Sequence, residues 1–170
     1  MLSVVMRLEK FHTSKNYNLK RFDCNNEMIN TFVKKSLKKR VKRGLSQAYI
    51  LLDGERMVGF YTLDSFAITR DSFEGSESIH VGLPPMVPVI KLGMLGVDKH
   101  YQRKGIGKRL LRDAFVKVME VSDVIGCKGI YLLAESEAIT FYKKLGFVAL
   151  NDTKPTPMFL PVETIKALMI

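Results

Sequence analysis

The sequence has few of the residues that build disulfide frameworks or metal sites. It contains two cysteines, Cys24 and Cys127, and three scattered histidines, so neither a disulfide framework nor metal ligands at the usual spacing are expected. No apolar run approaches the ~20 residues that span a bilayer. The first residues also lack the apolar core and small-residue cleavage site of a secretory signal. These absences predict a protein of the reducing cytoplasm, with no metal and no membrane partner.

What the chain has in excess is positive charge. Lysine and arginine number 27 against 17 aspartates and glutamates, which gives a net charge of +10. This surplus favours polyanionic partners, such as coenzyme phosphates, nucleic acid or an acidic protein, but it does not choose among them. With 170 residues, 46% of them apolar, the chain suits one globular domain, and we expect residues 1–170 to form it.

Hydrophobic periodicity predicts a mixed α/β domain. Short or alternating apolar segments indicate strands, and apolar residues three or four apart indicate helices. The expected strands are 6–8, 48–52, 58–63, 89–97, 130–133, 147–148 and 158–160. The expected helices are 28–41, ending before Gly44, one that begins near 106, and 138–145, ending before Gly146. Asp53-Gly54 predicts a hairpin turn, whereas 69–88 is expected to be one long loop without secondary structure.

The stretch VDKHYQRKGIGKRLL, residues 97–111, places two glycines and several basic residues between an expected strand and an expected helix. This arrangement aims backbone N–H groups and a helix dipole at a phosphate. The alternative is that Gly105 and Gly107 only shape a turn. A G-x-G pair by itself leaves both interpretations open.

A second motif further along the chain favours the phosphate interpretation. QRKGIG at 102–107 and FYKKLGF at 141–147, in this order and at this separation, resemble the signature motifs of the GCN5-related N-acetyltransferases, the GNAT superfamily. The resemblance extends from about the first expected strand to the last. It implies the GNAT fold, an α/β (α+β) architecture in which helices flank a central mixed, mostly antiparallel twisted sheet. It also implies an enzyme that transfers an acetyl group from acetyl-coenzyme A (acetyl-CoA) to an amine.

By this resemblance, the cosubstrate acetyl-CoA binds along the loop and the strand before it. Backbone amides of the loop and of the helix start would hold the pyrophosphate; they belong to Arg103, Lys104, Gly105, Ile106, Gly107 and Lys108. The strand residues Leu95, Gly96 and Val97 would hydrogen-bond the pantetheine arm and the thioester carbonyl, whose developing negative charge a fixed N–H stabilises. The alternative for Leu95 and Val97 is ordinary core packing.

The resemblance also assigns Tyr142 as the catalytic residue. A tyrosine at this place in the family protonates the departing coenzyme thiolate as a general acid; the alternative is a tyrosine of the core or its rim. Many relatives have asparagine seven residues earlier, where this sequence has Glu135, so the role of Glu135 stays open. The general base is also open among Glu135, Glu137 and a bound water. No motif suggests a covalent acyl-enzyme.

Several further segments resemble the acetyltransferase toxins of bacterial type II toxin–antitoxin modules. They are 22–24, 42–46, 58–63, 84–88 followed by 92–98, and 158–161. Those toxins acetylate the amino group of aminoacyl-tRNA, which blocks translation. They are typically homodimers and are neutralised by a ribbon–helix–helix antitoxin. The resemblance therefore implies aminoacyl-tRNA as the substrate, with an antitoxin and a second copy of the chain as partners.

A basic helix face fits such a substrate. Seven basic residues and no acid lie between 34 and 43, more than solubility needs, because like charges four residues apart repel each other. Six of them are expected to contact tRNA phosphates without reading sequence: Lys34, Lys35, Lys38, Lys39, Lys42 and Arg43. The alternative is a solvated helix face.

Two other functions stay open at this point. One is a GNAT enzyme that acetylates a small-molecule amine or a protein amino group. The other is a non-catalytic module of the same fold that binds RNA or a protein. The presence of both QRKGIG and Tyr142 argues against the non-catalytic module.

Overall fold

The computed structural model describes residues 5–75, 79 and 81–169, which form two compact units. Unit 1 takes its residues from Met1–Asp64 and Gly93–Ala114, and unit 2 from Ser65–Leu92 and Phe115–Ile170. Two long strands, β3 (Arg56–Thr69) and β4 (Met86–Val97), contribute to both units. The expected single domain over 1–170 stays a prediction.

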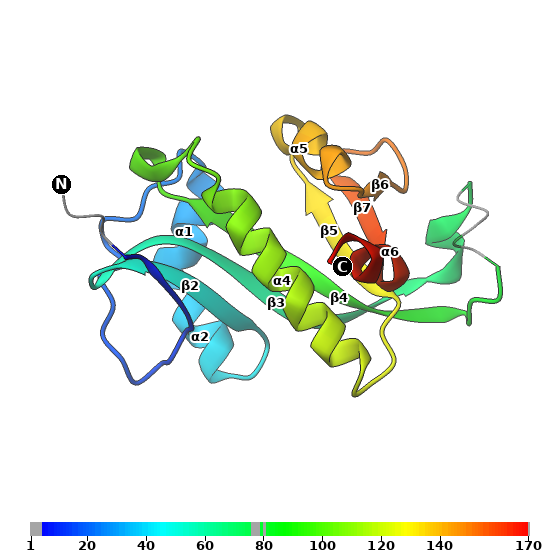
Figure 1. The fold of residues 1–170 in the computed structure, drawn as a ribbon, viewed down its shortest axis with the longest axis horizontal. Coiled ribbons are helices and arrows are strands. Elements are labelled where there is room, and N and C mark those ends of the chain that lie inside the picture. Colours follow the sequence, from blue (N-terminus) through cyan, green and yellow to red (C-terminus); the bar gives the residue numbers. More distant parts are fainter. Residues whose placement is uncertain (1–4, 76–78, 80, 170) are drawn as a thin grey trace. The chain divides into compact units, whose positions relative to one another are not determined.

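Within the described residues, seven strands hydrogen-bond in the order β1-β2-β3-β4-β5-β7-β6 (Figure 1). The other strands are β1 (Arg7–Lys10), β2 (Gln47–Asp53), β5 (Gly129–Ala134), β6 (Val148–Ala149) and β7 (Thr156–Pro161). The pairs β1–β2, β2–β3, β5–β7 and β6–β7 are antiparallel, and β4–β5 is parallel. The expected α/β class, with a mixed and mostly antiparallel sheet, is confirmed.

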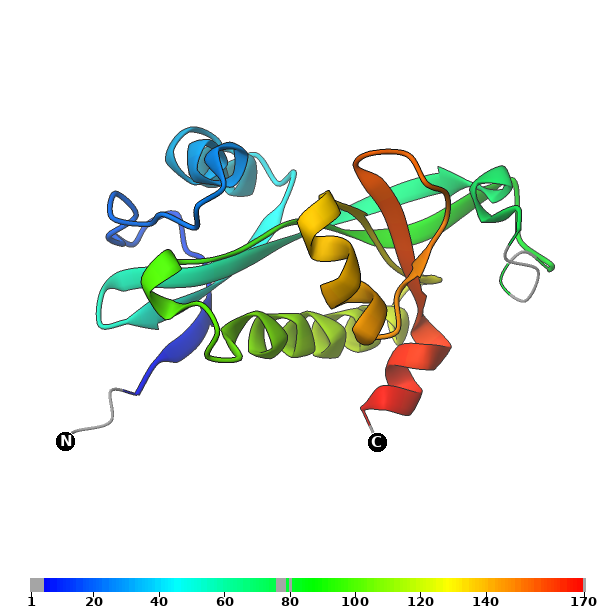
Figure 2. The ribbon, with the colours of Figure 1, turned by 90° about the horizontal axis from the view of Figure 1, so that it is seen from above.

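In unit 1, helices cover both faces of the sheet (Figure 2). The helices α1 (Glu27–Lys35) and α2 (Leu37–Lys42) lie on one face, and the first turns of α4 (Ile106–Ser122) lie on the other. Two adjacent residues of β3 mark the faces. The Phe60 ring stacks on Phe32 of α1 with centroids 6.3 Å apart, whereas a Cβ at Gly59 would lie 3.1 Å from Leu110 of α4. Successive strand residues point to opposite faces, which places each helix on its own side.

The expected single helix over 28–41 is wrong, because the chain forms two helices that meet at Ser36. Ser36 leaves helical geometry with φ −123° and ψ −31°, although its N–H still donates to the Phe32 carbonyl at 2.8 Å. Serine hydroxyls compete for backbone hydrogen bonds, which makes serine a weak residue inside a helix. Val33 and Leu37 are nevertheless both buried. The apolar spacing therefore continues across the interruption and does not reveal it.

The expected structureless loop over 69–88 is also wrong. The strand β3 continues to Thr69, a short 3-10 helix η1 (Arg70–Phe73) follows, and β4 already begins at Met86. Residues 76–78 and 80 of the expected loop lie outside the described residues.

A small core in unit 2 explains this difference. Phe73 is fully buried, and Val87 and Val89 are nearly so, in one cluster with Ile68. Between the two valines, Pro88 is exposed, so β4 alternates as a strand should even though it contains a proline. The polar and proline-rich composition hides this alternation from sequence inspection.

Two further helices belong to unit 2. After the short 3-10 helix η3 (Ser136–Ala138), α5 (Ile139–Lys144) ends before Gly146, as expected. The last helix, α6 (Val162–Leu168), was not expected, because only Val162 and Ile165 of it are buried and two residues make no recognisable period. Within the described residues, no helix is long and apolar enough to cross a membrane.

Candidate functional site

The glycine loop, residues 102–107, leads from β4 into α4 in unit 1. Arg103 and Gly105 have positive φ angles of 63° and 78°. The Arg109 N–H donates to the Gly105 carbonyl at 3.1 Å and opens the hydrogen-bond ladder of α4, so the amides from Gly105 to Lys108 have no acceptor within the helix. A Cβ at Gly105 would meet nothing within 4 Å. Free amides at a helix start, with open space beside them, suit an anion.

A buried carboxylate holds the segment just before this loop. Asp98, with 0% of its surface exposed, caps the 3-10 helix η2 (Lys99–Tyr101) by accepting a hydrogen bond from the His100 N–H at 2.9 Å. Its other oxygen accepts from the Asp23 N–H at 3.2 Å and lies 3.4 Å from the Arg56 guanidinium. Asp98 therefore ties three segments of unit 1 together. Sequence reasoning missed it, although an aspartate two residues before a backbone donor is a capping signal.

Two side chains of the same region hold the loop itself. The Gln102 side-chain amide donates to the Val97 carbonyl at 2.9 Å and to the Cys24 carbonyl at 3.2 Å. The Tyr101 ring lies 5.6 Å from the Lys104 ammonium. The Tyr101 hydroxyl donates to Asp53 at 2.7 Å, and this hydrogen bond raises the Tyr101 pKa. These contacts hold the loop against neighbouring segments of unit 1.

The end of β4 has an edge without a strand partner. The parallel pair β4–β5 consists of Ile90↔Ile130 and Lys91↔Tyr131. In the described chain, no strand pairs with β4 from 92 to 97 on that side, so the backbone around Leu95 has no strand partner there. The Val97 carbonyl accepts the hydrogen bond of the Gln102 side-chain amide described above. Gly96 is buried, and a Cβ there would lie 3.1–3.3 Å from three side chains of unit 1. A larger residue at this position would therefore push these side chains aside by a few tenths of an ångström.

Tyr142 lies in α5, in unit 2. It is 8% exposed, and its ring makes edge contacts with Phe141 and Phe147 at centroid distances of 5.2 and 5.3 Å. Burial raises the pKa of Tyr142 to about 12. Among the described residues, none hydrogen-bonds its hydroxyl. The side chain is therefore protonated at neutral pH, and its hydroxyl has no hydrogen-bond partner among the described residues.

The two acidic candidates for a general base lie at η3: Glu135 immediately precedes this helix and Glu137 lies within it. Glu135 is half-buried and Glu137 is exposed. Neither carboxylate makes a hydrogen bond or ion pair within the described part of the chain, and the geometry favours neither one. Over the same residues, no group of three or more His, Cys, Asp or Glu side chains could hold a metal ion.

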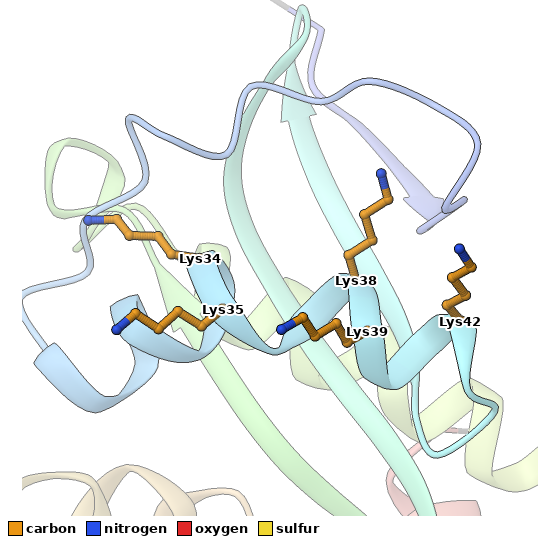
Figure 3. Close-up of a pocket in the computed structure, with 5 residues that line it drawn as sticks. All are labelled: Lys34, Lys35, Lys38, Lys39 and Lys42. Carbon is orange, nitrogen blue, oxygen red and sulfur yellow. The ribbon is translucent and has the colours of Figure 1, made fainter.

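A groove of about 310 Å³ on α1 and α2 is lined by lysines, and we call it the lysine groove. Its lining residues are Lys34, Lys35, Lys38, Lys39 and Lys42. In Figure 3 the first two extend from α1 and the other three from α2. All five are exposed, and none forms an ion pair with a described residue. Ammonium groups gathered without counter-charges create a strongly positive local potential. Arg43, also exposed, follows as the C-cap of α2.

Arg40 has a different role from these lysines. Its Nε donates to the Ser46 hydroxyl at 2.9 Å, and its guanidinium lies 3.4 Å from the Asp64 carboxylate. These contacts tie α2 to the beginning of β2 and to β3. Arg40 thereby holds the helix that carries most of the lysine groove on the sheet.

Comparison with known proteins finds one family and several relatives. The model of the acetyltransferase (GNAT) domain matches residues 44–149. The chain is 33% identical over 137 residues to the "tRNA-acetylating toxin" of Mycobacterium tuberculosis, with 80% of each chain covered. It is 28% identical over 162 residues to the "Probable toxin TacT" of Sinorhizobium fredii, with 87% of each covered.

Solved structures match over almost the whole chain. A bacterial toxin superposes with a TM-score of 0.91 at 32% identity, covering 98% of this chain and 96% of that one. AtaT complexed with acetyl-methionyl-tRNAfMet gives a TM-score of 0.89 at 29% identity, with 98% and 100% covered. A mutant of the toxin AtaT, bound to the C-terminus of the antitoxin AtaR and to acetyl-CoA, gives 0.84 at 28% identity, with 96% and 97% covered.

Proposed function

This chain belongs to the GNAT acetyltransferase family, and on that premise we propose that it is a toxin that transfers the acetyl group of acetyl-CoA to the amino group of aminoacyl-tRNA. An acetylated amino group has lost its nucleophilic lone pair to the amide, so it cannot attack a peptidyl ester, and translation stops. A relative named as a tRNA-acetylating toxin and a similar toxin structure with acetyl-methionyl-tRNA support the proposal.

The observation that carries the substrate assignment is the lysine groove. Five exposed lysines without acidic partners in the described chain suit the phosphate backbone of a nucleic acid. Counterions bound to that backbone are released when the lysine ammonium groups take their place. A polyamine would be repelled by the same potential. We assign phosphate contact to Lys34, Lys35, Lys38, Lys39, Lys42 and Arg43. These contacts position the RNA and read no sequence.

We assign acetyl-CoA binding to the glycine loop and the end of β4. The open amides of the loop and the α4 dipole suit the pyrophosphate. The amides that we assign to it are those of Arg103, Lys104, Gly105, Ile106, Gly107 and Lys108. The unpaired β4 edge at Leu95, Gly96 and Val97 suits the pantetheine amides and the thioester carbonyl. An N–H directed at that carbonyl stabilises the negative charge that develops there during transfer.

In the proposed reaction the neutral amine attacks the thioester carbonyl carbon, and the carbon–sulfur bond breaks. The thiolate leaves and takes the proton of the Tyr142 hydroxyl. The raised pKa of Tyr142 keeps this proton in place until the sulfur departs. The attacking nitrogen loses its own proton to water or to a carboxylate, and the tyrosinate left at Tyr142 regains a proton from solvent.

We also propose the partners that this function implies. The similar structure that contains the C-terminus of the antitoxin AtaR supports neutralisation of this chain by an antitoxin, here expected to be of the ribbon–helix–helix class. A second copy of the chain would complete a homodimer. Its location would be the cytoplasm, where charged tRNA is found.

The deciding experiment incubates the wild-type protein with labelled acetyl-CoA and charged tRNA at low salt. Label should appear as an N-acetylated amino acid after the aminoacyl ester is hydrolysed, and uncharged tRNA should acquire none. Absence of transfer to any charged tRNA would overturn the proposal. It would leave an enzyme that acts on a small-molecule amine or a protein amino group.

A further inference from the structure

Two aromatic rings and one cation meet on the sheet of unit 2, and none of them has a role in the reaction proposed above. Phe66, Lys91 and Tyr131 come from the neighbouring strands β3, β4 and β5 (Figure 1), and we call them the aromatic patch. Lys91 and Tyr131 are register partners in the parallel β4–β5 pair. Their side chains therefore leave the sheet on the same face.

The three side chains are in mutual contact. The rings of Phe66 and Tyr131 are nearly parallel, with an interplanar angle of 12° and centroids 5.6 Å apart. The Lys91 ammonium lies 4.9 Å from the Phe66 centroid and has no acidic partner among the described residues. Phe66 is 41% exposed, and Leu133, two residues beyond Tyr131 on the same face, is 45% exposed. This surface therefore combines two nearly parallel aromatic rings and an exposed leucine with one positive charge, that of Lys91.

We propose that the aromatic patch binds unpaired nucleotides of the RNA substrate, those of the single-stranded 3′ end that carries the aminoacyl group. This inference rests on the proposed function. Aromatic side chains stack on bases of any identity, and Lys91 supplies a cation for a phosphate. Bases within a duplex are already stacked, so only an unpaired end offers its base faces to a protein ring.

The charge of Lys91 favours a nucleotide over an apolar protein segment as the ligand of the aromatic patch. A hydrophobic peptide could cover Phe66 and Leu133, but it would cover the unpaired Lys91 ammonium as well, and desolvation of an uncompensated charge is costly. A nucleotide satisfies both parts of the surface, because it carries a planar base and a negative phosphate.

The affinity for a probe RNA tests the inference without requiring acetyl transfer. The probe is a labelled single-stranded RNA ending in CCA, with no amino acid, and its affinity is measured by fluorescence anisotropy at low salt. Phe66→Leu keeps an apolar side chain but removes the ring, and we expect the affinity to fall by about 5- to 150-fold, the range for one base–aromatic stack. The variant Phe66→Tyr keeps an aromatic ring and should bind the probe with nearly wild-type affinity. Lys91→Gln should weaken binding and lower the salt slope by about 0.7.

The matched control is Met86→Leu, an exposed apolar position in the same unit, which should leave the affinity unchanged. Unchanged affinity in both Phe66→Leu and Lys91→Gln, with normal thermal melting, would overturn the inference, as would a wild-type protein that does not bind the probe. The proposed function is judged separately by label transfer to charged tRNA. Should that transfer occur, a higher KM for charged tRNA in Phe66→Leu supports the patch, and an unchanged KM opposes it.

Discussion

We propose that residues of the glycine loop bind acetyl-CoA through their backbone amides, so the test adds a side chain to the loop. Gly107 is half-buried near the start of α4. A glutamate there suits the helix, because negative charge near a helix N-terminus is favourable. It also places a charge of the same sign where we expect the pyrophosphate. We predict that Gly107→Glu loses acetyl-CoA binding, measured by calorimetry, while its melting temperature stays near that of the wild type.

Gly126→Glu is the control for this prediction. Gly126 is exposed, and a Cβ there would meet nothing within 4 Å, so the same charge is added without touching the loop. Its acetyl-CoA affinity should equal that of the wild type. Undiminished affinity in a folded Gly107→Glu protein would remove the glycine loop from the coenzyme site.

Tyr142→Phe removes a hydroxyl that no described residue hydrogen-bonds. We therefore expect the fold and the acetyl-CoA affinity to change little. Acetyl transfer to charged tRNA should fall by about 10²–10⁴-fold, the usual contribution of general acid catalysis. Single-turnover kinetics with saturating acetyl-CoA measures the effect. Near-normal turnover would mean that the thiolate leaves without a proton from Tyr142.

The pH profile gives a separate test at the same residue. Burial raises the pKa of Tyr142 to about 12, so the hydroxyl keeps its proton far above neutral pH. The amine must be neutral to attack, and α-amino groups titrate at about 7.7–8.0. The value of kcat/KM should rise through about pH 8 and then stay level to about pH 10. A wild-type decline that begins below pH 10 and is absent in Tyr142→Phe would contradict the raised pKa.

At the scale of elements, α1 and α2 matter together because both line the lysine groove. Reversing Lys35, Lys39 and Lys42 to Glu should sharply reduce acetylation of charged tRNA. Each lost phosphate contact should lower the salt slope of binding by about 0.7–0.9, so three should lower it by roughly two units or more. A salt series of tRNA affinities measures the slope. Acetyl-CoA affinity should hardly change, since the glycine loop is intact.

A second triple charge reversal distinguishes the effect of the lysine groove from the effect of a lower net charge. Lys10, Lys20 and Lys154 are exposed and do not line the groove, and changing them to Glu gives the same total charge. This protein should acetylate charged tRNA almost as the wild type does. Equal losses in the two variants would show that general attraction, rather than the groove, recruits the RNA.

The break at Ser36 illustrates what apolar spacing can and cannot show about elements. Residues four apart, such as Val33 and Leu37, stay on one face whether the helix is continuous or interrupted. The expected helix was therefore placed correctly along the chain but was not divided. The end of β3 and the start of β4 were misjudged for a related reason. Burial of Phe73 and Val87 depends on partners elsewhere in unit 2, and local composition does not report those partners.

At the scale of the whole molecule, the strands β3 and β4 each run through both units. Both strands are continuous across the division between the units, so we expect unfolding of one unit to disturb the strand residues of the other. We therefore predict one cooperative transition, with calorimetric and van't Hoff enthalpies in a ratio near one. Scanning calorimetry, compared with circular dichroism, provides both values. Two resolved transitions would contradict the single domain that we expect over residues 1–170.

The sequence by itself determined the features that depend on neighbours along the chain. QRKGIG and FYKKLGF indicated the acetyltransferase family, Gly44 and Gly146 marked the ends of helices, and the basic run from 34 to 43 predicted a cationic surface. A few adjacent residues decide turn geometry, helix ends and local charge. These features can therefore be recognised before the fold is known.

Only the tertiary structure decided which distant residues meet. Asp98 accepts a hydrogen bond from Asp23, 75 residues away, and Arg40 pairs with Asp64 rather than joining the lysine groove. The aromatic patch likewise needs the register that sets Lys91 beside Tyr131. Strand order and register follow from burial of the whole sheet, and a shift of one residue would send each side chain to the opposite face. Long-range packing therefore decides these contacts, and the local sequence pattern does not contain them.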